Sequence, residues 1–327
     1  MSFPVSDLWL EAETALGYHA YYGLHLSGIK KLVVLYGPSH TILDRIADTY
    51  AERGAHIARW HSVYDPEALT GVVLRPLGVA WISGEIARRV TPSGNVSVES
   101  LMVGPELPSD VDRTIKEYQA RIKQCLVGCA AAMAEYELAA QGPVPSVEPW
   151  VRNWRNQLLG QRAFSSHPVD IHSFGSPLTA DGPDQRFLAD SFSRLDLSLH
   201  LINGLPGMSS RLIRRFGETA LMQGHTVHFY HDALKPSRVN HVVLPQLGIG
   251  MTDSTAPYDV PGGRQRIVVD AAFGRQTDVD GAESWWTIYQ TFYHQAWQLL
   301  DEIRTLRREW SLWLDIDIAR LASRCTA

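Results

Sequence analysis

The chain has 327 residues, of which 45% are hydrophobic, and its formal net charge is -5. This length accommodates two domains of ordinary size, and the acidic balance argues against the basic surface that nonspecific nucleic-acid binding requires. The N-terminal segment lacks a secretory signal pattern, no later apolar run is long enough to span a membrane, and three cysteines suit a reducing compartment. We therefore expect a cytoplasmic protein with neither nucleic-acid nor membrane partners.

An internal repeat organises the sequence. Residues 61–84 align without a gap with residues 231–254, an offset of 231 - 61 = 170. The alignment superposes His61 on His231 and Pro66 on Pro236, and "TALG" from Thr14 likewise resembles "TADG" from Thr179. Coincidences in a single register indicate a tandem duplication. The first repeat is predicted to cover residues 1–150 and the second residues 151–327.

In chain order, each repeat reads as strand, turn, helix, strand and a further strand pair. The first repeat has "KLVVLYG" to Gly37, a turn "GPSHT", a helix to Gly54, "AHIARWH" and a strand pair that ends near Ser83. The second has "LSLHLING" to Gly204, a helix "SSRLIRRFGETALMQG" to Gly224, "HTVHFYH" and a pair that ends at Asp253. Both helices stop at a glycine suited to a left-handed cap. This order predicts an α/β fold in which each repeat is a three-layer αβα domain with a mostly parallel sheet.

A long helical arm follows in each repeat, expected over residues 110–140 and 284–322. Each arm carries an apolar heptad stripe. The stripe positions are Val111, Ile115, Tyr118, Ile122, Cys125, Cys129, Ala132, Tyr136 and Ala139, and Trp285, Tyr289, Phe292, Ala296, Leu299, Ile303, Leu306, Trp310 and Trp313. We expect the arms to pack together or against the sheets, and the two cysteines to serve as small buried hydrophobes instead of metal ligands.

The stretch "GLPGMSSRL" from Gly204 resembles the phosphate-binding pattern G-x-x-x-x-G-K-[ST] without its lysine. The candidate phosphate-binding residues are Gly204, Pro206 and Gly207 in the turn, Ser209 and Ser210 at the helix start, and Arg211 as a replacement cation. Asp253 closes a downstream apolar strand and is the candidate Mg²⁺ ligand. The alternative is an ordinary strand-to-helix turn capped by Ser209, with Asp253 as a second capping residue.

The first repeat has lost more of this pattern. Its turn is about three residues shorter, and Ser83 stands where the second repeat has Asp253. We therefore expect its site to be abolished.

The histidines after the strands have two interpretations. His61 and His231 are either turn histidines bonded to backbone or, for His231, part of the nucleotide site. A three-histidine metal site at His225, His228 and His231 is not expected, because on a strand the odd spacing sends His228 to the opposite face.

The segments "GLPGMSSRL" and "VHFYHDALKPSRVNHVVLPQLGIGMTDSTAPY" resemble an uncharacterised bacterial group of tandem P-loop ATPase-like proteins, whose loop reads like "GRPGTGKST" and whose later strand closes with "DSTAPH". The resemblance covers both repeats and implies two P-loop NTPase-like domains. It also implies nucleotide phosphates at Gly204, Gly207, Ser209 and Ser210, a magnesium carboxylate at Asp253 and a role for His231. The chain departs from that pattern in lacking the loop lysine in both repeats.

Two functions follow. The first is a structural or regulatory pseudo-ATPase with weak or no nucleotide binding, whose arm helices are the surface for a protein partner or for self-association. The alternative is a protein that binds ATP or GTP with Mg²⁺ in the second repeat and hydrolyses it slowly. No catalytic residue is identified for either.

Overall fold

The computed structural model describes residues 5–91, 95–140, 146–160, 168–203, 207–254, 265–270 and 279–312. The first repeat contains one six-stranded sheet of β1 (Val5–Leu8), β4 (Lys31–Tyr36), β5 (Ile57–His61), β6 (Leu69–Leu74), β7 (Val79–Ser83) and β8 (Ser97–Met102). Around this sheet lie α1 (Tyr22–His25), α2 (His40–Glu52), α3 (Gly84–Ala87), the 3-10 turn Arg75–Leu77 and the hairpin of β2 (Glu11–Thr14) and β3 (Gly17–Ala20).

The second repeat has the same set of strands. Its six-stranded sheet consists of β9 (Asp170–Phe174), β12 (Ser198–Asn203), β13 (Val227–His231), β14 (Val239–Leu244), β15 (Ile249–Asp253) and β16 (Gln265–Asp270). It is accompanied by α5 (Glu148–Trp154), the π-helical turn Arg155–Leu159, α6 (Arg186–Arg194), α7 (Met208–Met222) and the short hairpin of β10 (Leu178–Thr179) and β11 (Gly182–Pro183).

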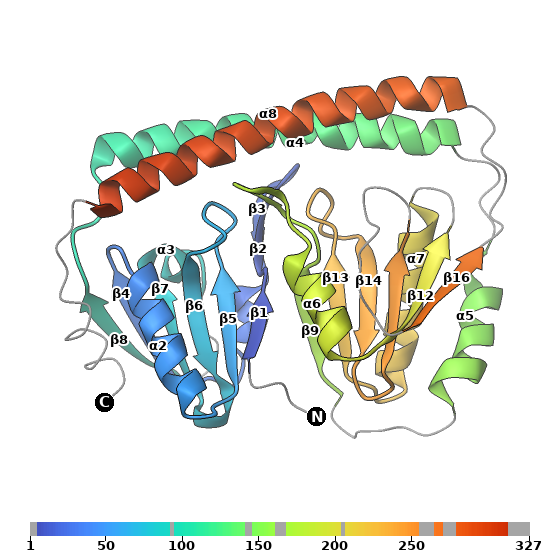
Figure 1. Cartoon of the computed structure of the whole chain (residues 1–327), viewed down its shortest axis with the longest axis horizontal. Helices are drawn as coiled ribbons and strands as arrows, with labels where there is room; N and C mark the ends of the chain where they lie inside the picture. Colours follow the sequence, from blue (N-terminus) through green and yellow to red (C-terminus); the bar gives the residue numbers. More distant parts are fainter. Residues whose placement is uncertain are drawn as a thin grey trace.

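The two sheets share one topology. Their strand orders are β1-β5-β6-β7-β4-β8 and β9-β13-β14-β15-β12-β16. In each sheet only the third strand, β6 or β14, runs opposite to the others. The mostly parallel α/β sheet predicted from the sequence is confirmed, and the identical orders agree with a tandem duplication (Figure 1).

Local features repeat as well. A register shift falls between Trp60 and His61 in β5 and between Tyr230 and His231 in β13. Glycines with positive φ follow both sheet-covering helices, Gly54 at 73° and Gly224 at 85°, as the sequence predicted. Equivalent residues therefore adopt equivalent conformations.

The strands before and after each helix are not neighbours in the sheet, because two strands lie between β4 and β5 and two between β12 and β13. The expected turn lengths need correction. The segment between strand and helix covers residues 37–39 in the first repeat and 204–207 in the second, while α2 has 13 residues and α7 has 15. Most of the three-residue length difference therefore lies in the helix and not in the turn.

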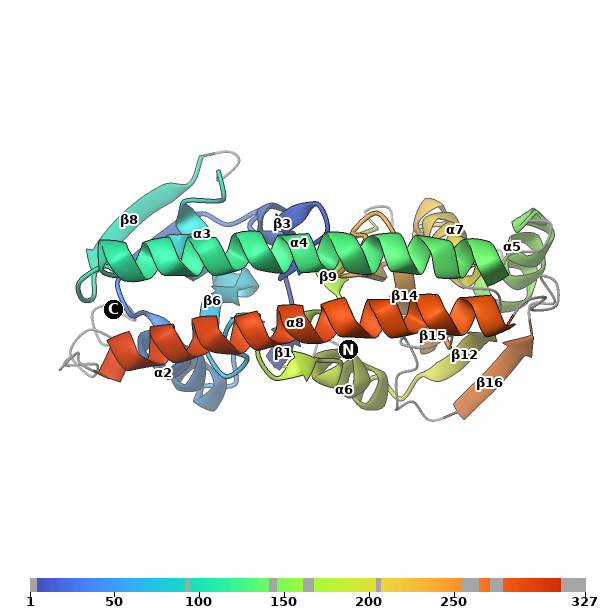
Figure 2. The ribbon, with the colours of Figure 1, turned by 90° about the horizontal axis from the view of Figure 1, so that it is seen from above.

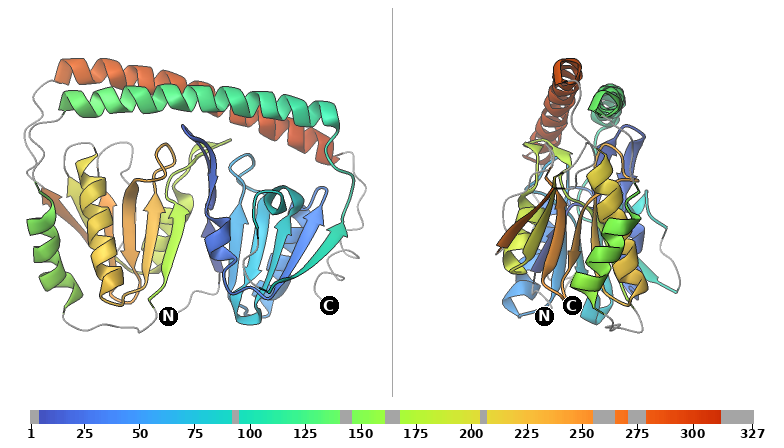
Figure 3. Two further views of the ribbon diagram at one scale, coloured as in Figure 1. Left: turned by 180° about the vertical axis from the view of Figure 1, so that it is seen from behind. Right: turned by 90° about the vertical axis from the view of Figure 1, so that its right-hand side faces the viewer.

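Helices cover both faces of each sheet. The alternating side chains of β4 divide between two buried clusters, Val33 and Leu35 packing with α2, and Leu32 and Val34 with α1 and α3. In the second repeat, the apolar side chains of β12 likewise belong to two clusters, one that includes α7 and one that includes α6. The layers can be followed from behind and from the side (Figure 3).

The arms are α4 (Ser109–Ala140) and α8 (Val279–Leu312). They lie side by side and antiparallel above both sheets (Figures 1 and 2). Cys129 Sγ donates to the carbonyl of Tyr289 at 3.6 Å, and a Cβ added at Gly128 would lie 2.7 Å from the Phe292 ring. Helix α8 begins earlier than the expected residue 284, and Trp313 lies outside the described residues.

The arm stripes and both repeats share one core. The buried cluster includes Cys129 and Tyr289 from the arms, Trp9 from the first repeat and Phe174 from the second, and Cys125 packs against it. The expected packing of the arms against each other is thereby confirmed, and so is the role of Cys129 as a buried hydrophobe, whereas Cys125 is only partly buried. The Phe174 amide donates to the Trp9 carbonyl at 2.8 Å. These two residues are equivalent, since 174 - 9 equals the hairpin offset 179 - 14, so the repeats meet about an approximate two-fold axis.

Within the described ranges, no helix combines the length and apolar character that a membrane span needs.

Candidate functional site

The loop of the second repeat leads into the N-terminus of α7. Gly207, with φ of 80°, precedes the first helical residue. Ser210 donates its hydroxyl to the Gly207 carbonyl at 3.1 Å, whereas the buried Ser209 hydroxyl has no hydrogen-bond partner among the described residues. Gly204 and Pro206 lie outside the described residues. The predicted alternative in which Ser209 caps the helix is wrong, because Ser209 lies inside α7 and the structure shows no side-chain cap.

Asp253 lies at the same end of the sheet as this loop. It is 2% exposed at the end of β15, directly beside Ile202 of the parallel strand β12 that leads into the loop. Its counterpart Ser83 also ends its strand, but accepts a hydrogen bond from the amide of Ile86 at 3.4 Å and caps α3. No group of three metal-ligating side chains occurs in the part of the chain that the structure describes.

A carboxylate from the first repeat's arm lies at the N-terminus of α7. Glu137 of α4 is 8% exposed, and its Oε2 lies 3.2 Å from the place that a Cβ on Gly207 would take. Arg238, at the end of the β13–β14 turn, donates to Oε1 and Oε2 of Glu137 at 2.5 and 2.9 Å. Lys235 Nζ lies 3.9 Å from the same carboxylate. A helix N-terminus and two cations therefore already surround one anion.

The cavity beside this carboxylate is strongly cationic. It has a volume of about 330 Å³, and its charged lining consists of Arg211, Arg214, Lys235, Arg238 and Glu137. Arg211 is exposed, and Arg214 also pairs with Glu218 outside the lining at 2.8 Å. Four cations face one acid in the lining, so the cavity attracts further negative charge.

His231 is a backbone-bonded histidine with a second histidine as its partner. Its Nδ1 donates to the Pro236 carbonyl at 2.6 Å, and its Nε2 lies 2.8 Å from Nδ1 of His172. His61 makes the equivalent bond to the Pro66 carbonyl at 2.9 Å, but its Nε2 lies 2.9 Å from Oδ1 of Asp7. Both histidines end their strands and bond to backbone, as the first interpretation expected, and His231 is not among the residues that line the cationic cavity.

The remaining histidines of this segment are His225 and His228, for which no shared metal site with His231 was expected. His228 lies on β13, whereas His225 precedes that strand. Burial lowers the pKa of His228 to about 4.

The first repeat carries a cavity of about 570 Å³ at its own strand-to-helix turn, where the sequence predicted an abolished site. It lies among the ends of β4 and β7, the start of α2 and the C-terminal part of α8. Its basic residues are Arg88, Arg89, Lys116, Arg307 and Arg308, and its acidic residues are Asp65, Glu85, Glu106 and Asp112. Each of these cations forms an ion pair with one of these acids. The cavity therefore has little spare positive charge.

Buried acids lie behind this cavity. Tyr18 and Tyr22 donate to Oε2 of Glu11 at 2.6 and 2.8 Å, and Tyr64 donates to Glu13. Burial raises the pKa of both glutamates. Burial alone would also raise the pKa of Glu85, but Arg307 of α8 holds it below its ordinary value.

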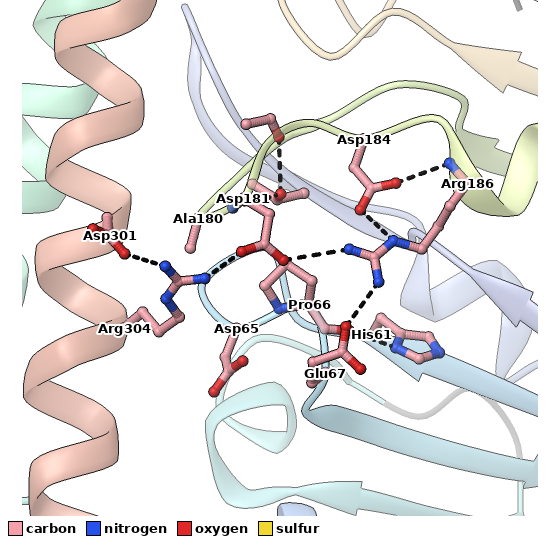
Figure 4. A network of polar contacts seen from close by, with 12 residues as sticks. His61, Asp65, Pro66, Glu67, Ala180, Asp181, Asp184, Arg186, Asp301 and Arg304 are labelled. Carbon is pink, nitrogen blue, oxygen red and sulfur yellow. Dashed lines mark hydrogen bonds and ion pairs between the residues drawn. The ribbon is translucent and has the colours of Figure 1, made fainter.

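Each arm thus reaches the loop region of the opposite repeat. A second set of ion pairs ties α8 to the hairpins between the repeats (Figure 4). Arg304 pairs with Asp181, and Arg186 donates to Glu67 of the first repeat at 2.8 Å and to Asp184 at 2.6 Å. These ion pairs and arm contacts consequently connect the two arms with the loop regions of both repeats.

No family model, curated protein or solved structure matches this chain. The candidate site therefore stands on its geometry. Sequence reasoning missed Glu137 and Arg238, which are 101 positions apart, and it missed Arg214 and Lys235. The basic residues within "SSRLIRR" and "KPSR" were the available signal, but nothing local pointed to the acidic partner on the arm.

Proposed function

We propose that the protein is a structural or regulatory pseudo-ATPase of P-loop NTPase-like ancestry, with weak or no nucleotide binding in its resting state. One observation carries this proposal: the carboxylate of Glu137 lies beside Gly207 and is held by Arg238. A nucleotide phosphate at this helix N-terminus would meet a negative charge in place of the lysine that the phosphate-binding pattern requires. The Glu137 carboxylate repels a phosphate at this position and occupies the hydrogen bonds of Arg238, so a phosphate must displace it to bind here.

The arrangement of Ser209 and Ser210 supports the same conclusion. The Ser210 hydroxyl is bonded to its own loop, and the Ser209 side chain is buried inside the repeat. A magnesium ion would need hydroxyl or carboxylate oxygens free to enter its coordination shell. Few side chains are therefore available to support slow nucleotide hydrolysis by positioning of the substrate alone.

The alternative is a binder of ATP or GTP with Mg²⁺ in the second repeat. It is favoured by the four cations around the 330 Å³ cavity, a volume at the lower end of the range for small-molecule sites. Arg211 would supply the charge that the missing lysine does not.

Phosphate release from Mg-ATP and Mg-GTP tests the two functions. We expect no release above the buffer blank, and only a small rise in melting temperature at millimolar nucleotide. A ligand present at its dissociation constant adds only about 0.4 kcal/mol of stability. Steady turnover that disappears in both Arg211→Ala and Asp253→Ala would establish the alternative and contradict the pseudo-ATPase.

A further inference from the structure

The contact between Glu137 and the second repeat has the properties of a ligand contact. The carboxylate comes from the arm α4, which is not part of the second repeat. It accepts two hydrogen bonds from Arg238 and lies beside Gly207 at the N-terminus of α7. Bidentate arginine contacts of this kind are typical of carboxylate and phosphate recognition. The arm thus places an anion where a diphosphate would be bound.

The charge around the contact is larger than one carboxylate needs. Arg211, Arg214 and Lys235 line the same cavity as the Glu137–Arg238 pair. A polyanion would satisfy more of these groups than the single resident carboxylate does.

We propose that Glu137 is an internal anion that closes this cavity, and that a ligand bearing a diphosphate group displaces it and releases the C-terminal end of α4. The inference rests on the proposed function, because it takes the loop to be a P-loop remnant that has kept anion recognition without turnover. When Glu137 leaves the cavity, Arg238 donates its hydrogen bonds to the ligand instead, and the C-terminal end of α4 becomes exposed. The arm thereby becomes a ligand-controlled surface.

Calorimetric titration with sodium pyrophosphate and with ADP, side by side, tests this mechanism. Removing the competing charge in Glu137→Gln is expected to tighten binding of pyrophosphate about tenfold or more relative to the natural chain. The matched control Glu135→Gln removes an exposed carboxylate from the same helix and should leave the affinity unchanged. Adding Arg238→Gln to Glu137→Gln should abolish the gain. The ratio of the two affinities tells whether the nucleoside contributes.

Hydrogen exchange provides a readout on the unaltered chain. Saturating pyrophosphate should accelerate amide exchange in the C-terminal half of α4 and leave its N-terminal half unchanged. Equal affinities in the natural chain and in folded Glu137→Gln would overturn the proposal, and so would unaltered exchange in α4 at millimolar pyrophosphate. Neither result bears on hydrolysis, so a failure here is distinct from ATP turnover, which would contradict the proposed function.

Discussion

His61 and His231 show how equivalent residues in the two repeats have acquired different surroundings. Both donate from Nδ1 to a proline carbonyl five residues ahead. At the other nitrogen, His61 faces Asp7, but His231 faces Nδ1 of His172. Since the Pro236 carbonyl can only accept, Nε2 of neutral His231 accepts from His172. A proton on that nitrogen would require His172 to move its own proton from Nδ1 to Nε2, which lies 3.3 Å from Oδ2 of Asp170.

This arrangement predicts an acid-sensitive residue. Burial and the neighbouring His172 lower the pKa of His231 to about 4, and His19 and Arg214 also disfavour its charge. A folded pKa below the unfolded value gives stability that is present above pH 6.5 and lost as the pH falls towards 4. At pH 5 this linkage lowers the unfolding free energy by roughly 2 kcal/mol relative to its value above pH 6.5.

Urea unfolding at pH 7.5 and pH 5 measures the effect. His231→Asn, whose amide can still donate to Pro236, should reduce the loss of unfolding free energy between these pH values by about 1 to 2 kcal/mol. Tyr21→Phe serves as the control, because it removes a neighbouring hydroxyl that donates to the same carbonyl at 3.2 Å but keeps the imidazole. A pH dependence that is the same in His231→Asn and the natural chain would contradict the assignment.

At the scale of elements, the sequence was most informative where a pattern is local. The strand that ends at Asp253 and the glycine after α7 follow from alternation and helix-stop signals. The heptad stripes correctly predicted which faces of the arms are buried. They could not predict that each arm crosses to the opposite repeat, because apolar side chains in a stripe do not specify a partner. The contact of Glu137 with Arg238 depends on that crossing.

The arm pairing leads to a prediction at Gly128, where α4 faces Phe292 of α8. An added Cβ there would lie 2.7 Å from the Phe292 ring, much closer than a normal carbon contact. We expect Gly128→Val to lower the unfolding free energy by about 2 kcal/mol or more, because overpacking outweighs any gain in helix propensity. Urea unfolding measures this loss. Gln124→Val, at an exposed position one turn earlier, introduces the same side chain and should cost less than about 1 kcal/mol. Equal losses in the two variants would show that the arms do not pack closely at Gly128.

At the scale of the molecule, the two contacts between arm and turn have opposite charge. In the first repeat the turn provides Asp65 and the arm α8 provides Arg308. At the equivalent position, 65 + 170 = 235, the second repeat provides Lys235, and the arm α4 provides Glu137. The sign of the charge on turn and arm is therefore reversed between the two halves. Each arm carries a charge that attracts the turn of the other repeat and would repel the turn of its own.

This asymmetry predicts how separated halves behave. The shared core draws Trp9 from one half, Phe174 from the other and both arms, so neither residues 1–140 nor residues 146–327 should unfold cooperatively when expressed alone. Expressed together, they should form a one-to-one complex, measurable by light scattering.

Two copies of the first half would place Glu137 opposite Asp65 in place of Lys235, and their repulsion should keep that homodimer weaker. The reversal Asp65→Lys should strengthen it, whereas the neighbouring Glu67→Lys should do so less, because Glu67 pairs with Arg186 and not with an arm. A homodimer of the unaltered first half as stable as the mixed complex would show that the opposite charges do not select the partner.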